Sequence, residues 1–204
     1  MGVTEPSGQL ELAGDERIQE YPPRALTGYE TLVEGHGVFG LHHTPGSGAS
    51  GAVVNAFNKS TVVGDRWYSS VQVWTPGGQN VAGPFNYTGT HSIAGISGEW
   101  VYITLPYHVN MEYLQITAHN GDAANAPNSA TIIGSSDGGT TWEQVGSWSD
   151  KTSSNFWLDG GVPSPNFTIN STKPLNAIGF VVTEANGWYA FTIGEIKFFG
   201  TPGP

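Results

Sequence analysis

The segment whose residue types best suit the recognition of a sugar runs from Asn186 through Gly187 and Trp188 to Tyr189. Aromatic rings stack on the apolar face of a sugar, while amide and imidazole groups hydrogen-bond to its hydroxyls. His43, at the start of another predicted loop, can supply such an imidazole. We therefore expect a ligand site built from His43, Asn186, Trp188 and Tyr189, although Trp188 fits a core position equally well.

Catalytic chemistry is not indicated by the arrangement of the histidines or the carboxylates. The six histidines are scattered, and none belongs to a His-Glu-x-x-His or His-x-His arrangement. Two carboxylates that met in space could hydrolyse a glycoside. Those of Glu112, Asp122, Asp137, Glu143 and Glu184, however, stand at positions typical of turns and surfaces. The sequence therefore predicts a protein that is not an enzyme.

The charge of the chain argues against two classes of partner. The net charge is −10, with only seven Lys and Arg residues among 204. Binding to nucleic acid or to an anionic membrane needs several cations on one face, and this sequence has no basic cluster. There is no cysteine, which excludes a disulfide scaffold. We expect no nucleic-acid partner and no membrane insertion.

The elements that position the candidate residues are predicted to be strands. Within the segment 98–148, apolar and polar residues alternate at period two, with Val101, Ile103 and Leu105 on one face. Asp137, followed by two glycines, supplies residues that tolerate positive φ and predicts a hairpin. About ten such strands with no convincing helix predict an all-β fold, an antiparallel jelly-roll β-sandwich over residues 25–204. Three tryptophans are expected in its core: Trp67, Trp100 and Trp142.

Residues 1–24 are expected to form a flexible or docking N-terminal arm. They are mostly polar and end in Pro22-Pro23, a stiff entry to the sandwich. Leu10 and Leu12 stand out in this polar stretch and are candidate anchors on a neighbouring subunit. A solvated, disordered terminus is the alternative. Ordering an arm of this kind costs conformational entropy, so it requires partner contacts.

Four pieces of the sequence, in order, resemble the discoidin domain, also called the coagulation-factor type C domain, of the galactose-binding-like superfamily. They span residues 36–200 and include an Ala-Phe-Asn loop, a Trp-Val-Tyr-Ile strand, a Ser-Asp-Gly hairpin and a closing Glu-Ile strand. The corresponding residues are 56–60 with 66–70, 99–105, 132–145 and 194–200. The cysteine pair of the secreted animal members is absent, and in this the chain is similar to virus- or phage-encoded versions.

The resemblance also implies a calcium ion. In the discoidin family, calcium often joins the Ala-Phe-Asp-Gly loop to the closing strand, and the matching positions here are Asn58, Thr61 and Glu195. Calcium is bound by six to eight oxygen atoms from carboxylates, amides and carbonyls. Asn58 stands where the family usually has Asp, so one negative charge is missing and the site should be weaker. A loop held by hydrogen bonds alone is the alternative.

Two functions remain open at the level of the sequence. The first is a non-enzymatic binding or assembly module on a larger particle, such as a structural or capsid decoration protein of a virion, with neighbouring subunits and cell-surface glycan as partners. The alternative is a soluble, lectin-like carbohydrate-binding domain. Residues 1–10 lack the pattern of a secretory signal. We expect a virion or extracellular surface as the location, and the cytoplasm if neither applies.

Overall fold

The chain folds into antiparallel β structure, seen here in a computed structural model that describes residues 17–45, 52–71, 73–75, 83–187 and 190–204. Two 3-10 turns, η1 (Val53–Phe57) and η2 (Ala123–Asn125), are the helical elements of the described residues, and neither is long enough to cross a bilayer. The strands are β1 (Gln19–Tyr21), β2 (Glu30–Val33), β3 (Gly37–His43), β4 (Trp67–Tyr68), β5 (Trp74–Thr75), β6 (Phe85–Tyr87), β7 (Ser92–Ile93), β8 (Ile96–Ser97), β9 (Glu99–Ala118), β10 (Pro127–Ser135), β11 (Glu143–Trp148), β12 (Phe167–Thr168), β13 (Leu175–Ala185) and β14 (Thr192–Pro202).

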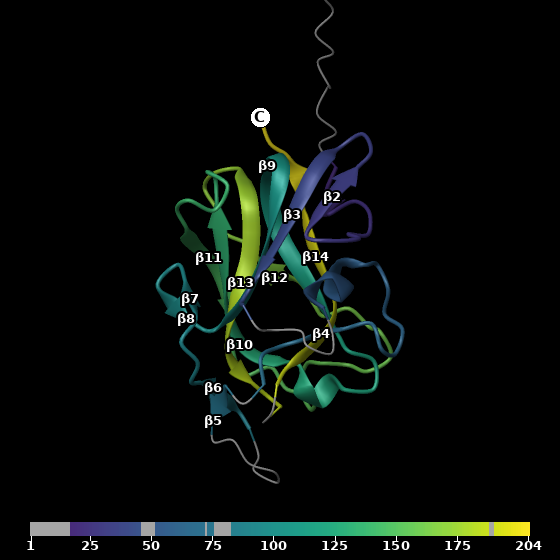
Figure 1. Cartoon of the computed structure of the whole chain (residues 1–204), viewed down its shortest axis with the longest axis vertical. Helices are drawn as coiled ribbons and strands as arrows, with labels where there is room; N and C mark the ends of the chain where they lie inside the picture. Colours follow the sequence, from purple (N-terminus) through teal and green to yellow (C-terminus); the bar gives the residue numbers. More distant parts are fainter. Residues whose placement is uncertain (1–16, 46–51, 72, 76–82, 188–189) are drawn as a thin grey trace, which may run out of the picture.

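The long strand β9 connects the layers of the sandwich (Figure 1). Its first part, 99–104, pairs with β3 and β13, and its last part, 109–118, pairs with β14 and β12. The main strand order is β1-β14-β9-β13-β10-β11. The sequence suggests two separate strands here, whereas the structure runs one strand through the exposed Pro106 between them. The predicted all-β sandwich is confirmed.

The core follows the period-two pattern of the strands. Val101 and Ile103 are fully buried, and Leu105 is nearly so. Trp67 is also fully buried and meets the edge of Phe191, with ring centroids 5.0 Å apart. Burial of an aliphatic side chain such as Val101 or Ile103 stabilises the folded state by roughly 1.5–3 kcal/mol. The alternation therefore fixes which face of β9 is covered.

Trp100 and Trp142 are not core residues, which corrects the expectation for two of the three tryptophans. Both are half-buried. All three contacts involve Tyr102. Its ring stacks on Trp100 and on His42 of the neighbouring strand, with ring centroids 5.7 Å and 4.5 Å apart. Trp142 meets the edge of the same ring. The physical reason is the parity of the strand, because even-numbered positions of this part of β9 face outward. Contact with the Tyr102 ring covers part of the surface of Trp100 and Trp142 that the core does not bury.

The hairpin predicted at Asp137 joins β10 to β11. Gly138 and Gly139 have φ angles of 70° and 92°, which glycine adopts without strain. The Asp137 carboxylate accepts hydrogen bonds from the backbone N–H and hydroxyl of Thr141 and from the Ser135 hydroxyl. These bonds to the charged form lower the pKa of Asp137 to about 2. The local sequence therefore determined this turn.

The boundary between arm and domain lies earlier in the chain than residue 25. β1 pairs with β14, Gln19 opposite Gly200 and Tyr21 opposite Phe198, and the Tyr21 side chain is only 1% exposed. Pro22-Pro23 therefore follows a paired strand instead of preceding the domain. Sequence reasoning misplaced the boundary because three residues are too few to show a periodic pattern. Leu10 and Leu12 lie outside the described residues, so their anchoring role stays a prediction.

Candidate functional site

The β7–β8 hairpin carries His91 to the start of β9. Ala94 and Gly95, with φ angles of 55° and 74°, form the turn between Ile93 and Ile96. Gly98 donates its backbone N–H to the carbonyl of His91 at 3.1 Å. A Cβ atom on Gly98 would lie 2.4 Å from the carbonyl oxygen of Val182, so this close approach to β13 requires glycine. The hairpin is thereby held directly beside Glu99.

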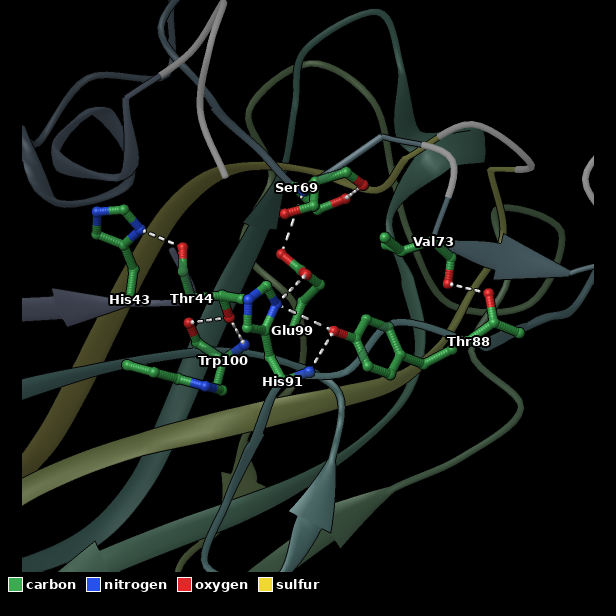
Figure 2. Close-up of polar contacts among 10 residues, drawn as sticks. His43, Thr44, Ser69, Val73, Thr88, His91, Glu99 and Trp100 are labelled. Atoms are coloured by element: carbon green, nitrogen blue, oxygen red, sulfur yellow. Dashed lines mark hydrogen bonds and ion pairs between the residues drawn. The ribbon is translucent and has the colours of Figure 1, made fainter. Parts of the chain in front are cut away.

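Glu99 is a completely buried carboxylate at the first position of β9 (Figure 2). Its Oε2 accepts a hydrogen bond from the backbone N–H of Ser70 at 3.2 Å. Its Oε1 lies 3.9 Å from Nδ1 of His91 and has no hydrogen-bond partner among the described residues. Burial raises the pKa of Glu99, while the Ser70 bond and the nearby imidazole act in the opposite direction.

His91 is held from two sides through its Nδ1 atom. The hydroxyl oxygen of Tyr87 lies 3.3 Å from this nitrogen and also accepts the backbone N–H of His91 at 3.2 Å. Gly89 makes this possible, because a Cβ atom there would lie 2.3 Å from the Tyr87 hydroxyl. The side chain of His91 is 36% exposed. A buried carboxylate and a phenol therefore orient an imidazole that reaches solvent.

Thr44 ties the predicted site residue His43 to the same end of β9 (Figure 2). Trp100 donates its backbone N–H to the hydroxyl oxygen of Thr44 at 2.6 Å, and Thr44 donates its own N–H to the carbonyl of Trp100 at 2.9 Å. The Nδ1–H of His43 donates to the Thr44 carbonyl at 2.8 Å, and its ring stacks on Tyr29 at 5.3 Å. His43 is therefore a half-buried ring fixed beside the start of β9.

The amide of Asn186 joins three segments of the chain. Its Nδ2 donates to the carbonyls of Ala126 at 2.8 Å and Lys151 at 2.7 Å, and its Oδ1 accepts from Nδ2 of Asn128 at 3.0 Å. These bonds occupy both ends of the side chain and give Asn186 a positioning role. The other two predicted ligand residues, Trp188 and Tyr189, lie outside the described residues, so the ligand set as a whole stays a prediction.

Glu195 is a second buried carboxylate, on β14 beside the η1 loop. It is 1% exposed, and neither carboxylate oxygen has a hydrogen-bond partner among the described residues. Burial raises its pKa to about 8, against the opposing positive charges of Lys59 and Lys197. Both lysines pair with Glu20, and Lys59 also donates to the carbonyl of Pro22 at 2.7 Å. Two buried oxygen atoms without partners fit the residence of a cation.

The other two predicted calcium ligands have different surroundings. Oδ1 of Asn58 accepts the backbone N–H of Ser60 at 2.9 Å, and Thr61 is exposed beside Gly161. The intervening Lys59 has a φ of 61°, a conformation that suits the glycine of the resembled loop. In the described part of the chain no three His, Asp or Glu side chains converge. A cation at Glu195 would therefore take its remaining ligands from carbonyl, amide and hydroxyl oxygens.

Comparison with solved structures places this architecture among known β-sandwiches. The chitosan-binding module 1 of a chitosanase/glucanase from Paenibacillus sp. IK-5 is 18% identical, with a TM-score of 0.50 over 78% of this chain and 93% of the module. The C-terminal domain of a chitobiase from Bacteroides fragilis is 16% identical, with a TM-score of 0.53 over 81% and 95%. The family 32 carbohydrate-binding module of C. perfringens NanJ, solved with galactose, is 12% identical, with a TM-score of 0.50 over 79% and 93%.

The fold is galactose-binding-like. No protein-family model matches the sequence, and a comparison with curated proteins finds no match. The fold that the four sequence pieces implied is thus confirmed for this galactose-binding-like domain, while its viral origin stays a prediction. Sequence reasoning missed Glu99 and His91 as a pair. The parity of β9 could have found Glu99, because it shares the inward face of Val101 and Ile103.

Proposed function

We propose that this galactose-binding-like domain is a non-catalytic carbohydrate-binding module. The observation that carries the proposal is the half-exposed imidazole of His91, oriented through Nδ1 by the buried Glu99 and by Tyr87. A fixed ring nitrogen beside aromatic side chains suits a sugar hydroxyl, since sugars are recognised by a few well-placed polar groups and a stacking ring. Structural similarity to modules solved as chitosan-binding or galactose-bound supports the same class of ligand.

A glycan array followed by titration calorimetry on the best ligand tests the proposal. His91→Ala should weaken binding about fivefold, because a typical hydrogen bond contributes roughly 0.5–1.5 kcal/mol. His36→Ala is the matched control, since His36 contacts Tyr107 in a different part of the sandwich. Absence of glycan binding by the unaltered chain would overturn the function. Equal binding by His91→Ala and the unaltered chain would overturn this site.

The same proposal includes a structural calcium ion at Glu195. The support is chemical: a buried carboxylate without hydrogen-bond partners faces a loop whose oxygens can complete a coordination shell. The Glu195 carboxylate would bind the ion directly, and the ion would take the place of the proton that this buried carboxyl otherwise holds below about pH 8. Asn58 and Thr61 stay the predicted side-chain ligands from the loop. The ion would stabilise the loop and take no part in the recognition of sugar.

Display on a larger particle stays a prediction for this chain. The described surface that favours it is the cross-strand pair of Leu32 and Val38 on β2 and β3, which are 75% and 52% exposed. A neighbouring subunit's arm could bury these side chains. Deleting residues 1–16 should then leave the melting temperature of the sandwich unchanged and reduce incorporation into the particle. An unchanged incorporation would contradict the assembly role.

A further inference from the structure

An open groove of about 560 Å³ lies between β11 and the segment that contains β12. The two segments approach each other at Val145, whose carbonyl accepts the backbone N–H of Asn170 at 2.6 Å. Trp148 and Phe167 stack beneath the groove with centroids 4.4 Å apart, and Phe156 packs on Phe167 at 5.3 Å. β12 pairs with β9 at Tyr113 and Leu114, far along the strand from Glu99, and the groove shares no residue with the His91 site.

Lys151 is fixed at the rim of this groove. Its carbonyl accepts hydrogen bonds from Nδ2 of Asn186 at 2.7 Å and from Nε1 of Trp157 at 3.0 Å, and its N–H donates to the carbonyl of Asn128 at 3.1 Å. Its ammonium lies 4.9 Å from the centroid of the Phe156 ring. The Asn186 amide therefore holds the backbone of the one cationic residue in the groove lining.

The charge of the groove differs from that of the whole chain. Although the chain carries 17 Asp and Glu residues, none of those that the structure describes lines the groove. Its exposed polar groups are hydroxyls and amides with no carboxylate among them: those of Ser147, Ser149, Asn166, Thr168 and Asn170. This lining favours a ligand rich in hydroxyl groups that carries a negative charge.

We propose that the groove is a second saccharide site, which binds a sugar unit bearing a carboxylate or a sulfate. Lys151 pairs with the anionic group, the hydroxyls and amides of the two strands bond to the sugar hydroxyls, and the exposed part of Phe156 contacts its apolar face. A single cation is too few for nucleic acid, whose binding requires several phosphate contacts. The inference rests on the proposed carbohydrate-binding function and deepens it by naming a second ligand class.

The test uses three probes and the full chain produced without glycosylation, because Asn166 and Asn170 each begin an Asn-x-Ser/Thr sequence. The probes are a trisaccharide of galacturonic acid, galactose 6-sulfate and uncharged galactose. Amide NMR signals of Ser147 and Asn170 should shift with one or both anionic probes. Their affinity should fall as ionic strength rises. Lys151→Gln should weaken this binding at least about threefold and remove its salt dependence, whereas Lys173→Gln, outside the groove, should change neither.

The outcomes separate this inference from the proposed function. Galactose or array binding that depends on His91, with no response of the groove signals to either anionic probe, would overturn the second site and leave the function intact. Anionic sugar binding that is equal in Lys151→Gln and the unaltered chain would also overturn it. Groove shifts without any binding at His91 would support the second site and reject the first. A response to the carboxylate or to the sulfate alone identifies the anion.

Discussion

Glu99 and Glu195 are both buried carboxylates in the same sandwich, yet their surroundings differ. Glu99 accepts a backbone N–H from Ser70 and lies beside the imidazole of His91, so the protein itself satisfies most of its polar demand. Glu195 has no hydrogen-bond partner on either oxygen among the described residues. Because an unpaired buried charge is costly, Glu195 calls for a proton or a cation, whereas Glu99 has one hydrogen bond and an imidazole beside its other oxygen. Glu99 positions His91, whereas Glu195 is the carboxylate that we propose binds a cation.

The largest expected effect is the pH dependence of stability without calcium. Burial raises the pKa of folded Glu195 to about 8, whereas the unfolded chain releases this proton near the ordinary value of 4.5. The contribution of the protonated Glu195 side chain to the free energy of unfolding is therefore complete below about pH 4.5 and is lost as the pH rises to about 8. The total loss is on the order of 3–5 kcal/mol. Urea unfolding in the presence of a chelator measures it. Glu195→Gln should flatten this slope, and a slope unchanged in that variant would reject the assignment.

Calcium should produce the next largest effect. At a free concentration 100-fold above the dissociation constant, a ligand of the folded state stabilises it by about 2.7 kcal/mol. Calorimetric melting at pH 8 should show this gain in the unaltered chain and in Glu99→Gln, but not in Glu195→Gln. Glu99→Gln is the matched control because it changes the other buried carboxylate. Calcium stabilisation that persists in Glu195→Gln would place the ion elsewhere.

Replacing Glu99 tests the contribution of its hydrogen bond with the backbone N–H of Ser70. Glu99→Ala should destabilise the fold by about 2 kcal/mol, because the Ser70 N–H loses its acceptor in a buried place. Glu99→Gln keeps an oxygen for that bond and should cost less than half as much. Denaturant unfolding of the two variants gives the difference. Equal losses would mean that charge, and not the hydrogen bond, decides the stability contribution of Glu99.

The smallest expected effect concerns the loop residue Asn58. Asn58→Asp adds the carboxylate that the resembled family has at this position. It should tighten calcium binding by at least about 1 kcal/mol, which is the interaction energy of two unit charges 4 Å apart in water. Titration calorimetry with calcium measures the change. Asn86→Asp, on β6, adds the same charge outside the loop and is the control. An affinity that the loop variant does not raise would exclude Asn58 from the coordination shell.

Some site residues could be predicted from the sequence and others could not. The Asp137 turn followed from local glycines, whereas the metal-binding role of Glu195, implied by the resemblance of the closing strand, stays a prediction. The position of Trp100 was predicted wrongly, since an aromatic residue in an alternating strand satisfies either a core or a stacked outer position. Lys151 and Phe156 carry no sequence motif. Their groove is lined by residues of β11 and of the segment around β12, which only the tertiary structure brings together.

The sequence by itself determined the class of fold, the alternation along the first part of β9 and the central hairpin. Those properties depend on residues within a few positions of one another, where side-chain alternation and backbone φ preferences act directly. Only the tertiary structure decided that Glu99 meets Ser70 and His91, that Asn186 holds Lys151, and that Glu195 has no partner. Each of these depends on segments brought together across the sandwich, and a buried polar group reveals its role only when all of its neighbours are in place.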